Sequence, residues 1–246
     1  MKLAILGYGK MGQFVEQMAL ERNHDIVLTL DQPPKDQPLK DILAKSGAEV
    51  IIEFTQPDAA IANMKAAFEA KIPIVVGTTG WYEEMEAVKI ACETHEGALL
   101  YAGNFSLGVN MFFHLNEVLA KMMKAEDSDY WCEIFERHHT EKKDHPSGTA
   151  YTLVKSILEA SEKYQDWKDY PADAGKQSKA GEVPIYYERA VGEIGMHEVT
   201  YKSEIDEIKI KHQAFNRKGF AQGAVLAAEW LKGKKGLFTM KDILNF

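Results

Sequence analysis

The first part of the chain alternates between short apolar runs and longer amphipathic stretches. Apolar runs of four or five residues, bounded by glycine and polar residues, are typical of strands buried on both faces of a parallel sheet. Between them, apolar residues recur at the three- and four-residue spacing of a helix. The predicted strands are residues 3–6, 26–30, 50–54, 72–76 and 98–101, and the predicted helices include 58–70 and 82–94. This alternation predicts an α/β fold with an N-terminal Rossmann-type, doubly wound parallel sheet.

The pattern changes after residue 106, where the chain stops alternating between buried strands and helices. The expected elements are helices at residues 111–124 and 150–158 and strands at 130–135, 185–190, 196–203 and 207–214. The last three strands contain β-branched residues in period-two alternation, and we expect them to form an antiparallel meander. Residues 162–182 show little periodicity and are expected to form a long excursion. We therefore predict a second, α+β domain with an open mixed or antiparallel sheet.

Two helical patterns close the chain, at residues 220–232 and 237–244. The predicted division is residues 1–106 and 217–246 for the first domain and residues 107–216 for the second. An open sheet leaves a face or an edge uncovered, so oligomerisation through the second domain is expected.

A glycine-rich turn follows the first predicted strand. It comprises Gly7, Tyr8, Gly9, Lys10, Met11 and Gly12. A G-x-G-x-x-G sequence between a strand and a helix gives a tight turn, close backbone approach to a pyrophosphate, and close packing of helix on strand. Asp31 ends the second strand, nineteen residues after Gly12, at the position of an acid that accepts hydrogen bonds from a ribose. The arrangement predicts dinucleotide binding, against the alternative of a glycine-rich turn with no ligand.

Small and polar residues also follow the later strands of the first domain. They include Gly77, Thr78, Thr79, Ala102, Gly103, Asn104 and Phe105. Ligands of doubly wound sheets lie beyond the carboxyl ends of the strands, so these segments are expected to form a rim around the cofactor. Phe105 is a candidate platform for the nicotinamide ring.

The segment from Glu136 to Ala150 combines three histidines and two lysines with the start of a helix. Asp144 or Ser147 is expected to cap that helix, and the free N–H groups of Gly148 and Thr149 would then bind an anion. Lys142 and His139 are expected to reach the same anion, while His138 titrates near neutrality. This suggests proton donation to a small substrate that carries carboxylates. The alternative is a polar surface loop before an ordinary capped helix.

Composition limits the class of partner. The net charge of -8 over 246 residues argues against a broad basic surface for nucleic acid. Only Cys92 and Cys132 occur, which favours a reducing compartment over a disulfide framework. The first apolar run is too short for a signal-peptide core, and no stretch is long enough to span a bilayer. We expect a cytoplasmic protein with no membrane partner.

Together these motifs resemble the dihydrodipicolinate reductase family, also called 4-hydroxy-tetrahydrodipicolinate reductases, of bacterial lysine and diaminopimelate synthesis. The resemblance runs along nearly the whole chain, and its most specific part is Glu136-x-His138-His139-x-x-Lys142-x-Asp144-x-Pro146-Ser147-Gly148-Thr149-Ala150. The supporting segments are Phe54-Thr55-x-Pro57, Gly77-Thr78-Thr79-Gly80, Asn104-Phe105-Ser106-x-Gly108-Val109-Asn110 and Arg217-x-x-Phe220-Ala221-x-Gly223-Ala224.

The resemblance implies specific roles for these residues. His138 would be the proton donor and acceptor and Lys142 the proton donor, while His139, Gly148 and Thr149 would bind the dicarboxylic substrate. NADH or NADPH would be held by Gly7 to Gly12, Asp31, Gly77 to Thr79 and Ala102 to Phe105. Family members are usually homotetramers joined through sheets of the second domain, with the C-terminal segment returning to the first. No metal is implied.

The chain departs from the family pattern in three places. The phosphate loop is one residue shorter than the common form, with Lys10 where arginine is usual, and Gln32 follows Asp31 where NADP-using members often carry arginine. Asp31 would repel a 2′-phosphate, although Lys10 or Lys35 offers compensation, so we predict that NADH is used at least as well as NADPH. Residues 189–197 follow the family pattern only in part, and we assign them no role.

Three other functions remain open at this point. The nearest is another two-domain NAD(P)-dependent oxidoreductase, which would share the first domain but would not need the arrangement from Lys142 to Thr149. A non-catalytic redox sensor would bind a dinucleotide without clustered acids. A metal-dependent hydrolase would use the histidines, although His138, His139 and His145 lack an HExxH-type spacing.

Overall fold

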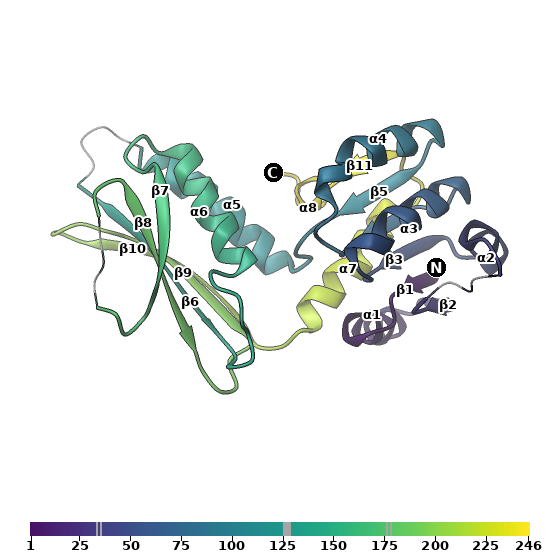
Figure 1. Cartoon of the computed structure of the whole chain (residues 1–246), viewed down its shortest axis with the longest axis horizontal. Coiled ribbons are helices and arrows are strands. Elements are labelled where there is room, and N and C mark those ends of the chain that lie inside the picture. Colours follow the sequence, from purple (N-terminus) through teal and green to yellow (C-terminus); the bar gives the residue numbers. More distant parts are fainter. Residues whose placement is uncertain (33, 35, 125–128, 176, 178) are drawn as a thin grey trace. The chain divides into compact units, whose positions relative to one another are not determined.

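The computed structural model describes residues 1–246 except 33, 35, 125–128, 176 and 178. Lys35, considered above as a compensating charge, lies outside the described residues. The described chain divides into two compact units (Figure 1). The first comprises Met1–Asn110 and Arg217–Phe246, and the second comprises Met111–Asn216. The first unit thus extends to Asn110, where the sequence prediction placed its boundary at residue 106.

The first unit contains a six-stranded sheet in which every pairing is parallel. Its strands are β1 (Lys2–Leu6), β2 (Asp25–Leu30), β3 (Val50–Glu53), β4 (Ile74–Val76), β5 (Ala98–Tyr101) and β11 (Gly236–Phe238). Its helices are α1 (Lys10–Glu21), α2 (Leu39–Ser46), α3 (Pro57–Glu69), α4 (Met85–Thr94), α7 (Lys218–Leu231), α8 (Met240–Leu244) and the 3-10 helix η1 (Tyr82–Glu84). The order is β11-β5-β4-β3-β1-β2, which confirms the doubly wound parallel sheet.

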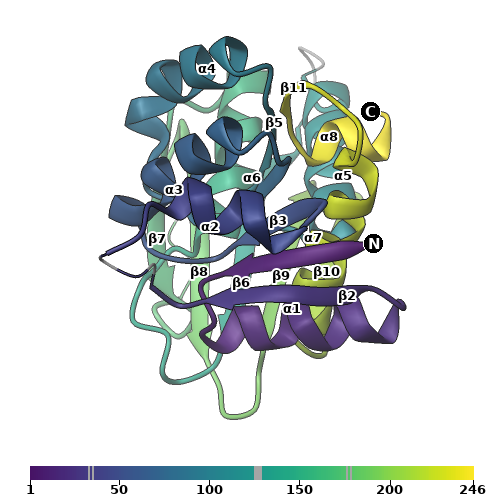
Figure 2. The ribbon, with the colours of Figure 1, turned by 90° about the vertical axis from the view of Figure 1, so that its right-hand side faces the viewer.

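Successive side chains of the central strands enter two different cores. Leu3 and Ile5 of β1 pack with residues of α1 and α7 on one face, while Ala4 and Leu6 pack with α2, α3 and α4 on the other. Strands β1 and β2 run side by side at one end of this sheet (Figure 2). Burial on both faces explains the continuous apolar runs. Because β1 and β3 are parallel neighbours, their carboxyl ends lie at the same edge of the sheet, where the strand order reverses.

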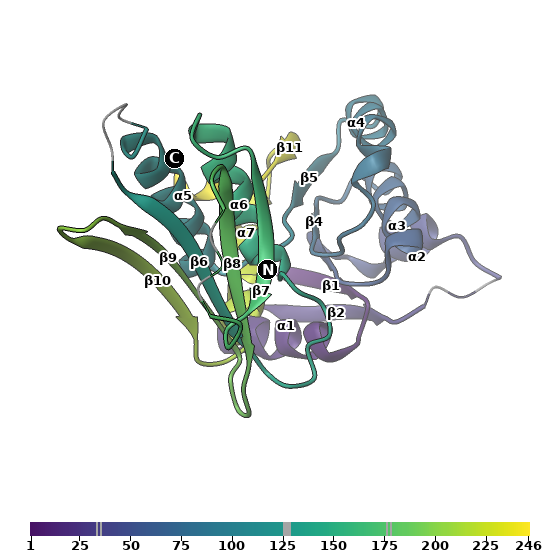
Figure 3. The same ribbon diagram turned by 60° about the vertical axis from the view of Figure 1, so that its left-hand side comes forward.

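The second unit contains a five-stranded mixed sheet in the order β10-β9-β6-β8-β7. Its strands are β6 (Trp131–His138), β7 (Asp166–Pro171), β8 (Glu182–Arg189), β9 (Gly195–Lys202) and β10 (Glu207–Ala214). Its helices are α5 (Leu107–Met122), which begins in the first unit, and α6 (Gly148–Ala160). Both helices lie on the same face of the sheet (Figure 3). Phe112 and Ala120 of α5 and Leu153 and Val154 of α6 pack against buried residues of the strands there.

Several predicted elements were wrong in detail. The expected meander is not one, because β8 pairs parallel with β6 and β7, and only β9 and β10 form an antiparallel pair of consecutive strands. The expected excursion contains β7. Residues 237–244 end with the short helix α8, as predicted, but they begin within the strand β11. The predicted helix at 82–94 begins as the 3-10 helix η1. Within the described residues, no helix is both long and apolar enough to cross a membrane.

Candidate active site

The glycine turn of the first unit connects β1 to α1, and its three glycines meet different surroundings. Gly7 has φ +86°, and a Cβ there would lie 2.0 Å from the carbonyl oxygen of Phe54. A Cβ on Gly12 would lie 2.2 Å from the carbonyl oxygen of Gly7. A Cβ on Gly9 would meet nothing within 4 Å. Gly7 and Gly12 are therefore required by the packing of the turn, while Gly9 leaves open the space that a pyrophosphate would occupy.

A cavity of about 530 Å³ lies at this edge of the first unit. It is lined by Gly9, Lys10, Met11, Phe54, Thr55, Gln56, Pro57, Gly77, Thr78 and Thr79. The cavity joins the turns that follow β1, β3 and β4, which is where doubly wound sheets bind dinucleotides. Asp31, at the end of β2, accepts the N–H of Tyr8 at 3.2 Å and so lies beside the glycine turn. These residues fit a nicotinamide dinucleotide.

Phe105, which follows β5, does not form the expected platform for a nicotinamide ring. Phe105 is 2% exposed and packs edge-to-face on Phe54, with ring centroids 6.0 Å apart. A Cβ on Gly223 of α7 would collide with the carbonyl oxygen of Phe105 at 1.8 Å. The ring of Phe105 belongs to the hydrophobic core, so it offers no exposed platform. Asn104 instead shapes the start of α5, because its Oδ1 accepts the N–H of Ser106 at 2.9 Å.

The loop of the second unit runs from His138, the last residue of β6, to Gly148, the first residue of α6. Ser147 is the cap of α6, since its Oγ accepts the N–H of Ala150 at 3.1 Å; of the two caps considered, the structure has Ser147 and not Asp144. In the part of the chain that the structure describes, neither the N–H of Gly148 nor that of Thr149 has an acceptor. A Cβ on Gly148 would meet nothing within 4 Å. The start of α6 thus presents two backbone N–H groups toward open space, an arrangement that suits an anion.

Two ion pairs shape this loop. The Nζ of Lys142 lies 2.6 Å from Oδ2 of Asp144, and this hydrogen bond holds the pKa of the Asp144 carboxyl below its ordinary value. The imidazole of His145 contacts the carboxylate of Asp169 and stacks on Tyr187, with ring centroids 4.2 Å apart. His145 therefore anchors the loop to β7 and β8. The two residues predicted to exchange protons, His138 and Lys142, both belong to this segment.

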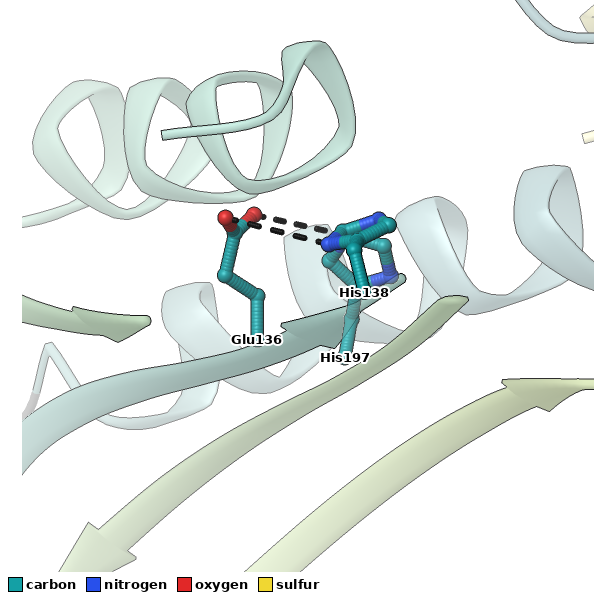
Figure 4. A group of neighbouring side chains, drawn as sticks. All are labelled: Glu136, His138 and His197. Carbon is teal, nitrogen blue, oxygen red and sulfur yellow. Dashed lines mark ion pairs between the residues drawn. The ribbon is translucent and has the colours of Figure 1, made fainter. Parts of the chain in front are cut away.

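Glu136, His138 and His197 form a buried polar cluster, of which only His138 was given a role from the sequence (Figure 4). Glu136, His138 and His197 face one another on β6 and β9, where Glu136 pairs directly with His197. Arg189, at the end of β8, forms an ion pair with Glu136 at 3.3 Å. The signal was present in the alternation of β6, because Glu136 shares a face with Cys132 and Ile134, and a carboxylate on a core-facing position requires partners.

Burial dominates the protonation of both histidines in this cluster. It lowers the pKa of His138 to about 4; the carboxylate of Glu136 opposes this shift, and the nearby charges of Lys142 and Arg189 reinforce it. Burial likewise lowers the pKa of His197 to about 3, with the neighbouring His138 adding to the shift. Both imidazoles are therefore neutral at pH 7. A dianionic ligand at the start of α6 would raise the pKa of His138, because opposite charge stabilises the imidazolium.

The same cluster has a geometry that admits a metal ion. The ligand atoms of Glu136, His138 and His197 all lie within 4.8 Å of one another. The guanidinium of Arg189, however, already occupies Oε1 of Glu136. A second cation at the same oxygen would be repelled by that charge.

The glycine turn with its cavity in one unit, and the histidine- and lysine-bearing loop before α6 in the other, fit a two-domain, dinucleotide-dependent oxidoreductase. Models of dihydrodipicolinate reductase match both parts, the N-terminus over residues 1–105 and the C-terminus over residues 108–244. The chain belongs to the dihydrodipicolinate reductase family.

Individual relatives agree with this assignment. The 4-hydroxy-tetrahydrodipicolinate reductase of Christiangramia forsetii is 45% identical over 245 residues, covering 100% of this chain and 98% of its own. The enzyme of that name from Alkaliphilus oremlandii is 35% identical, with 100% and 99% covered. Among solved structures, dipicolinate-bound dihydrodipicolinate reductase from Paenisporosarcina sp. TG-14 has a similar fold, with a TM-score of 0.81, 22% identity and 97% of each chain covered.

Proposed function

We propose that this chain catalyses the reduction of 4-hydroxy-tetrahydrodipicolinate to tetrahydrodipicolinate, a step of lysine and diaminopimelate synthesis. The observation that carries the proposal is the loop from His138 to Thr149. It combines an ammonium group, an imidazole and two unpaired backbone N–H groups on one short segment. A cyclic dicarboxylate needs donors for its carboxylates and an acid for the reduced ring, and this loop supplies both.

The start of α6 binds and orients the substrate in this mechanism. The N–H groups of Gly148 and Thr149 donate hydrogen bonds to one carboxylate, with the helix dipole adding to their attraction for the negative charge. The imidazole of His139 contacts the substrate from the opposite end of the loop. This binding is expected to draw Lys142 away from Asp144, because the substrate carries two negative charges and Asp144 carries one.

A nicotinamide dinucleotide held at the glycine turn would supply a hydride for an electron-poor ring carbon of the substrate. Two electrons and one hydrogen enter the ring with the hydride, and the enamine-like charge that remains is neutralised by a proton. We assign that proton to Nζ of Lys142. The imidazole of His138 is neutral before the substrate binds, so His138 acts as a proton acceptor. The 4-hydroxyl group leaves as water together with a proton from the adjacent ring carbon, so the whole reaction consumes one hydride and one proton.

Asp31 supports the choice of cofactor. Its carboxylate lies beside the glycine turn through the hydrogen bond from Tyr8 and would accept from the ribose hydroxyls of NADH. The same charge would repel the 2′-phosphate of NADPH. We propose that kcat/KM with NADH equals or exceeds that with NADPH, and a strong preference for NADPH would contradict this.

The test of the proposed function is oxidation of the reduced cofactor at 340 nm, with the substrate generated from aspartate semialdehyde and pyruvate by a synthase. Lys142→Ala and His138→Gln are each expected to lower kcat about a hundredfold or more while leaving the affinity for NADH unchanged, because neither residue belongs to the glycine turn or lines the cavity beside it. Lys143→Ala, one residue along the loop, is the matched control and is expected to retain wild-type turnover. Absence of turnover by the wild-type enzyme would refute the function, and near-normal turnover by either variant would refute that residue's role.

We also propose that the enzyme is a cytoplasmic homotetramer. Its support is the sheet of the second unit, where α5 and α6 cover a single face (Figure 3). Partly buried side chains of β6, among them Trp131 and Phe135, lie on the opposite face. Sedimentation equilibrium is expected to give four times the 27.7 kDa chain mass.

A further inference from the structure

The side chain of Glu136 is fully buried, with 0% exposed. Both of its carboxylate oxygens have a defined task. Oε1 accepts from Nη1 and Nη2 of Arg189, at 3.4 and 3.3 Å. Oε2 accepts the backbone N–H of Ser147 at 2.9 Å. Glu136 thereby holds the residue that caps α6, directly before the two N–H groups of the anion site.

Arg189 extends this control to the middle of the loop. Its Nε donates to the carbonyl oxygen of Lys142 at 3.1 Å, and its Nη2 donates to that of Asp144 at 2.7 Å. The ion pair between Glu136 and Arg189 therefore ties the backbone of Lys142, Asp144 and Ser147 to the ends of β6 and β8. Charged hydrogen bonds of this kind restrict the loop at three points.

The imidazole of His138 lies next to the same carboxylate. Its buried Nδ1 has no hydrogen-bond partner within the described chain, and Oε1 of Glu136 lies 3.8 Å away. On the other side of the ring, a Cβ on Gly195 would lie 3.3 Å from Cδ2 and Nε2 of His138. The carboxylate thus favours the tautomer with the proton on Nδ1, which leaves Nε2 as the nitrogen that exchanges protons.

We propose that Glu136, held by Arg189, is the positioning residue of this site: it sets the tautomer of His138 and fixes the start of α6 for the substrate carboxylate. The role of Glu136 in turnover rests on the proposed function. The tautomer of His138 and the capping of α6 are properties of the protein without substrate, so they can be tested independently.

The Glu136→Gln variant distinguishes a positioning role from a role in packing alone, because glutamine has nearly the same size as glutamate. A carboxylate presents two acceptor oxygens, whereas an amide presents one acceptor and one donor. In Glu136→Gln, the NH2 group must face either the guanidinium of Arg189 or the N–H of Ser147, so one of the two ties is lost. The matched control is Glu188→Gln. Glu188 pairs with Arg137 at 2.8 Å across the same two strands, on the opposite face.

Three measurements test the proposal in these two variants. We expect Glu136→Gln to lower kcat at least about tenfold and to raise KM for the substrate, with the affinity for NADH unchanged. In long-range 15N NMR spectra, His138 is expected to change from the Nδ1–H tautomer to a mixture. Glu188→Gln is expected to retain wild-type kcat and the wild-type His138 spectrum.

Specific results would overturn the proposal. Turnover in Glu136→Gln within about threefold of that in Glu188→Gln, or an unchanged His138 tautomer, would contradict it. If Glu136→Gln does not fold, Arg189→Lys provides the test, because a lysine keeps the charge but cannot reach Glu136 and both carbonyls together. Wild-type turnover by Arg189→Lys would then refute the role. A stoichiometric zinc ion in the purified enzyme would also overturn it. If the wild type does not turn over at all, the proposed function fails, while the NMR comparison still decides the positioning.

Discussion

His138 lies where the apolar face of β6 gives way to the loop, and this position determines its chemistry. The side chain is 10% exposed, so the imidazolium form loses most of its hydration. Glu136 only partly offsets that cost. The residue is therefore prepared to take up a proton when a dianionic ligand arrives.

The depressed pKa of His138 predicts a pH dependence of stability. In the unfolded chain the imidazole has its ordinary pKa near 6.5, against about 4 in the folded state. Between these values the unfolded state binds a proton that the folded state does not, so the free energy of unfolding falls as the pH is lowered from 6.5 toward 4. The loss attributable to His138 is about 2 kcal/mol at pH 5.

Urea unfolding at pH 7.5 and pH 5.0 measures this effect. The wild type is expected to lose about 2 kcal/mol more than His138→Gln over this interval, because glutamine has no proton to bind. Burial, the largest cause of the low pKa of His197, is present in both proteins, so the contribution of His197 largely cancels. An equal loss in the two proteins would show that His138 titrates normally in the folded state.

The contact between Glu136 and Arg189 could not be predicted from the sequence. His138, Lys142, Gly148 and Thr149 stand close together along the chain, so a local pattern was enough to group them. Arg189 lies 53 residues from Glu136. Its role depends on the parallel pairing of β6 with β8, which no local pattern encodes.

At the scale of elements, the glycine turn was predictable because strand, turn and helix are contiguous. The second sheet was predictable only in part. Strands β9 and β10 are consecutive and antiparallel, whereas β8 joins β6 over a long separation. The strand β11 has three residues, and its place in the sheet is set by pairing with β5 and not by its own composition. Short strands of this kind follow from tertiary contacts.

The different surroundings of the turn glycines give a paired prediction. Gly9→Ala adds a methyl group to open space at φ -76°, so the melting temperature is expected to stay near that of the wild type. The methyl group would occupy the space needed by the pyrophosphate, so the affinity for NADH is expected to fall at least about tenfold. Gly12→Ala places the methyl group against the carbonyl of Gly7 and is expected to lower the melting temperature by several degrees.

Thermal unfolding and NADH fluorescence titration distinguish the two variants. Gly9 would be only a structural residue if Gly9→Ala unfolded at a lower temperature and kept full affinity. The assignment of the cavity at this turn to the dinucleotide would then fail as well.

At the scale of the whole molecule, the two units divide the work of the reaction. The first contains the cavity beside the glycine turn, and the second contains the loop to which we assign substrate binding and proton transfer. Family membership extends over both units, since the two family models match residues 1–105 and 108–244. The function therefore belongs to the complete chain and to neither unit by itself.

A crystal structure with the nicotinamide cofactor and pyridine-2,6-dicarboxylate bound tests the central claim most directly. We expect a carboxylate of the ligand to lie about 3 Å from the backbone nitrogens of Gly148 and Thr149, with Lys142 released from Asp144 and turned toward the ring. A dicarboxylate bound elsewhere, with Lys142 still paired to Asp144 and the start of α6 empty, would contradict the account.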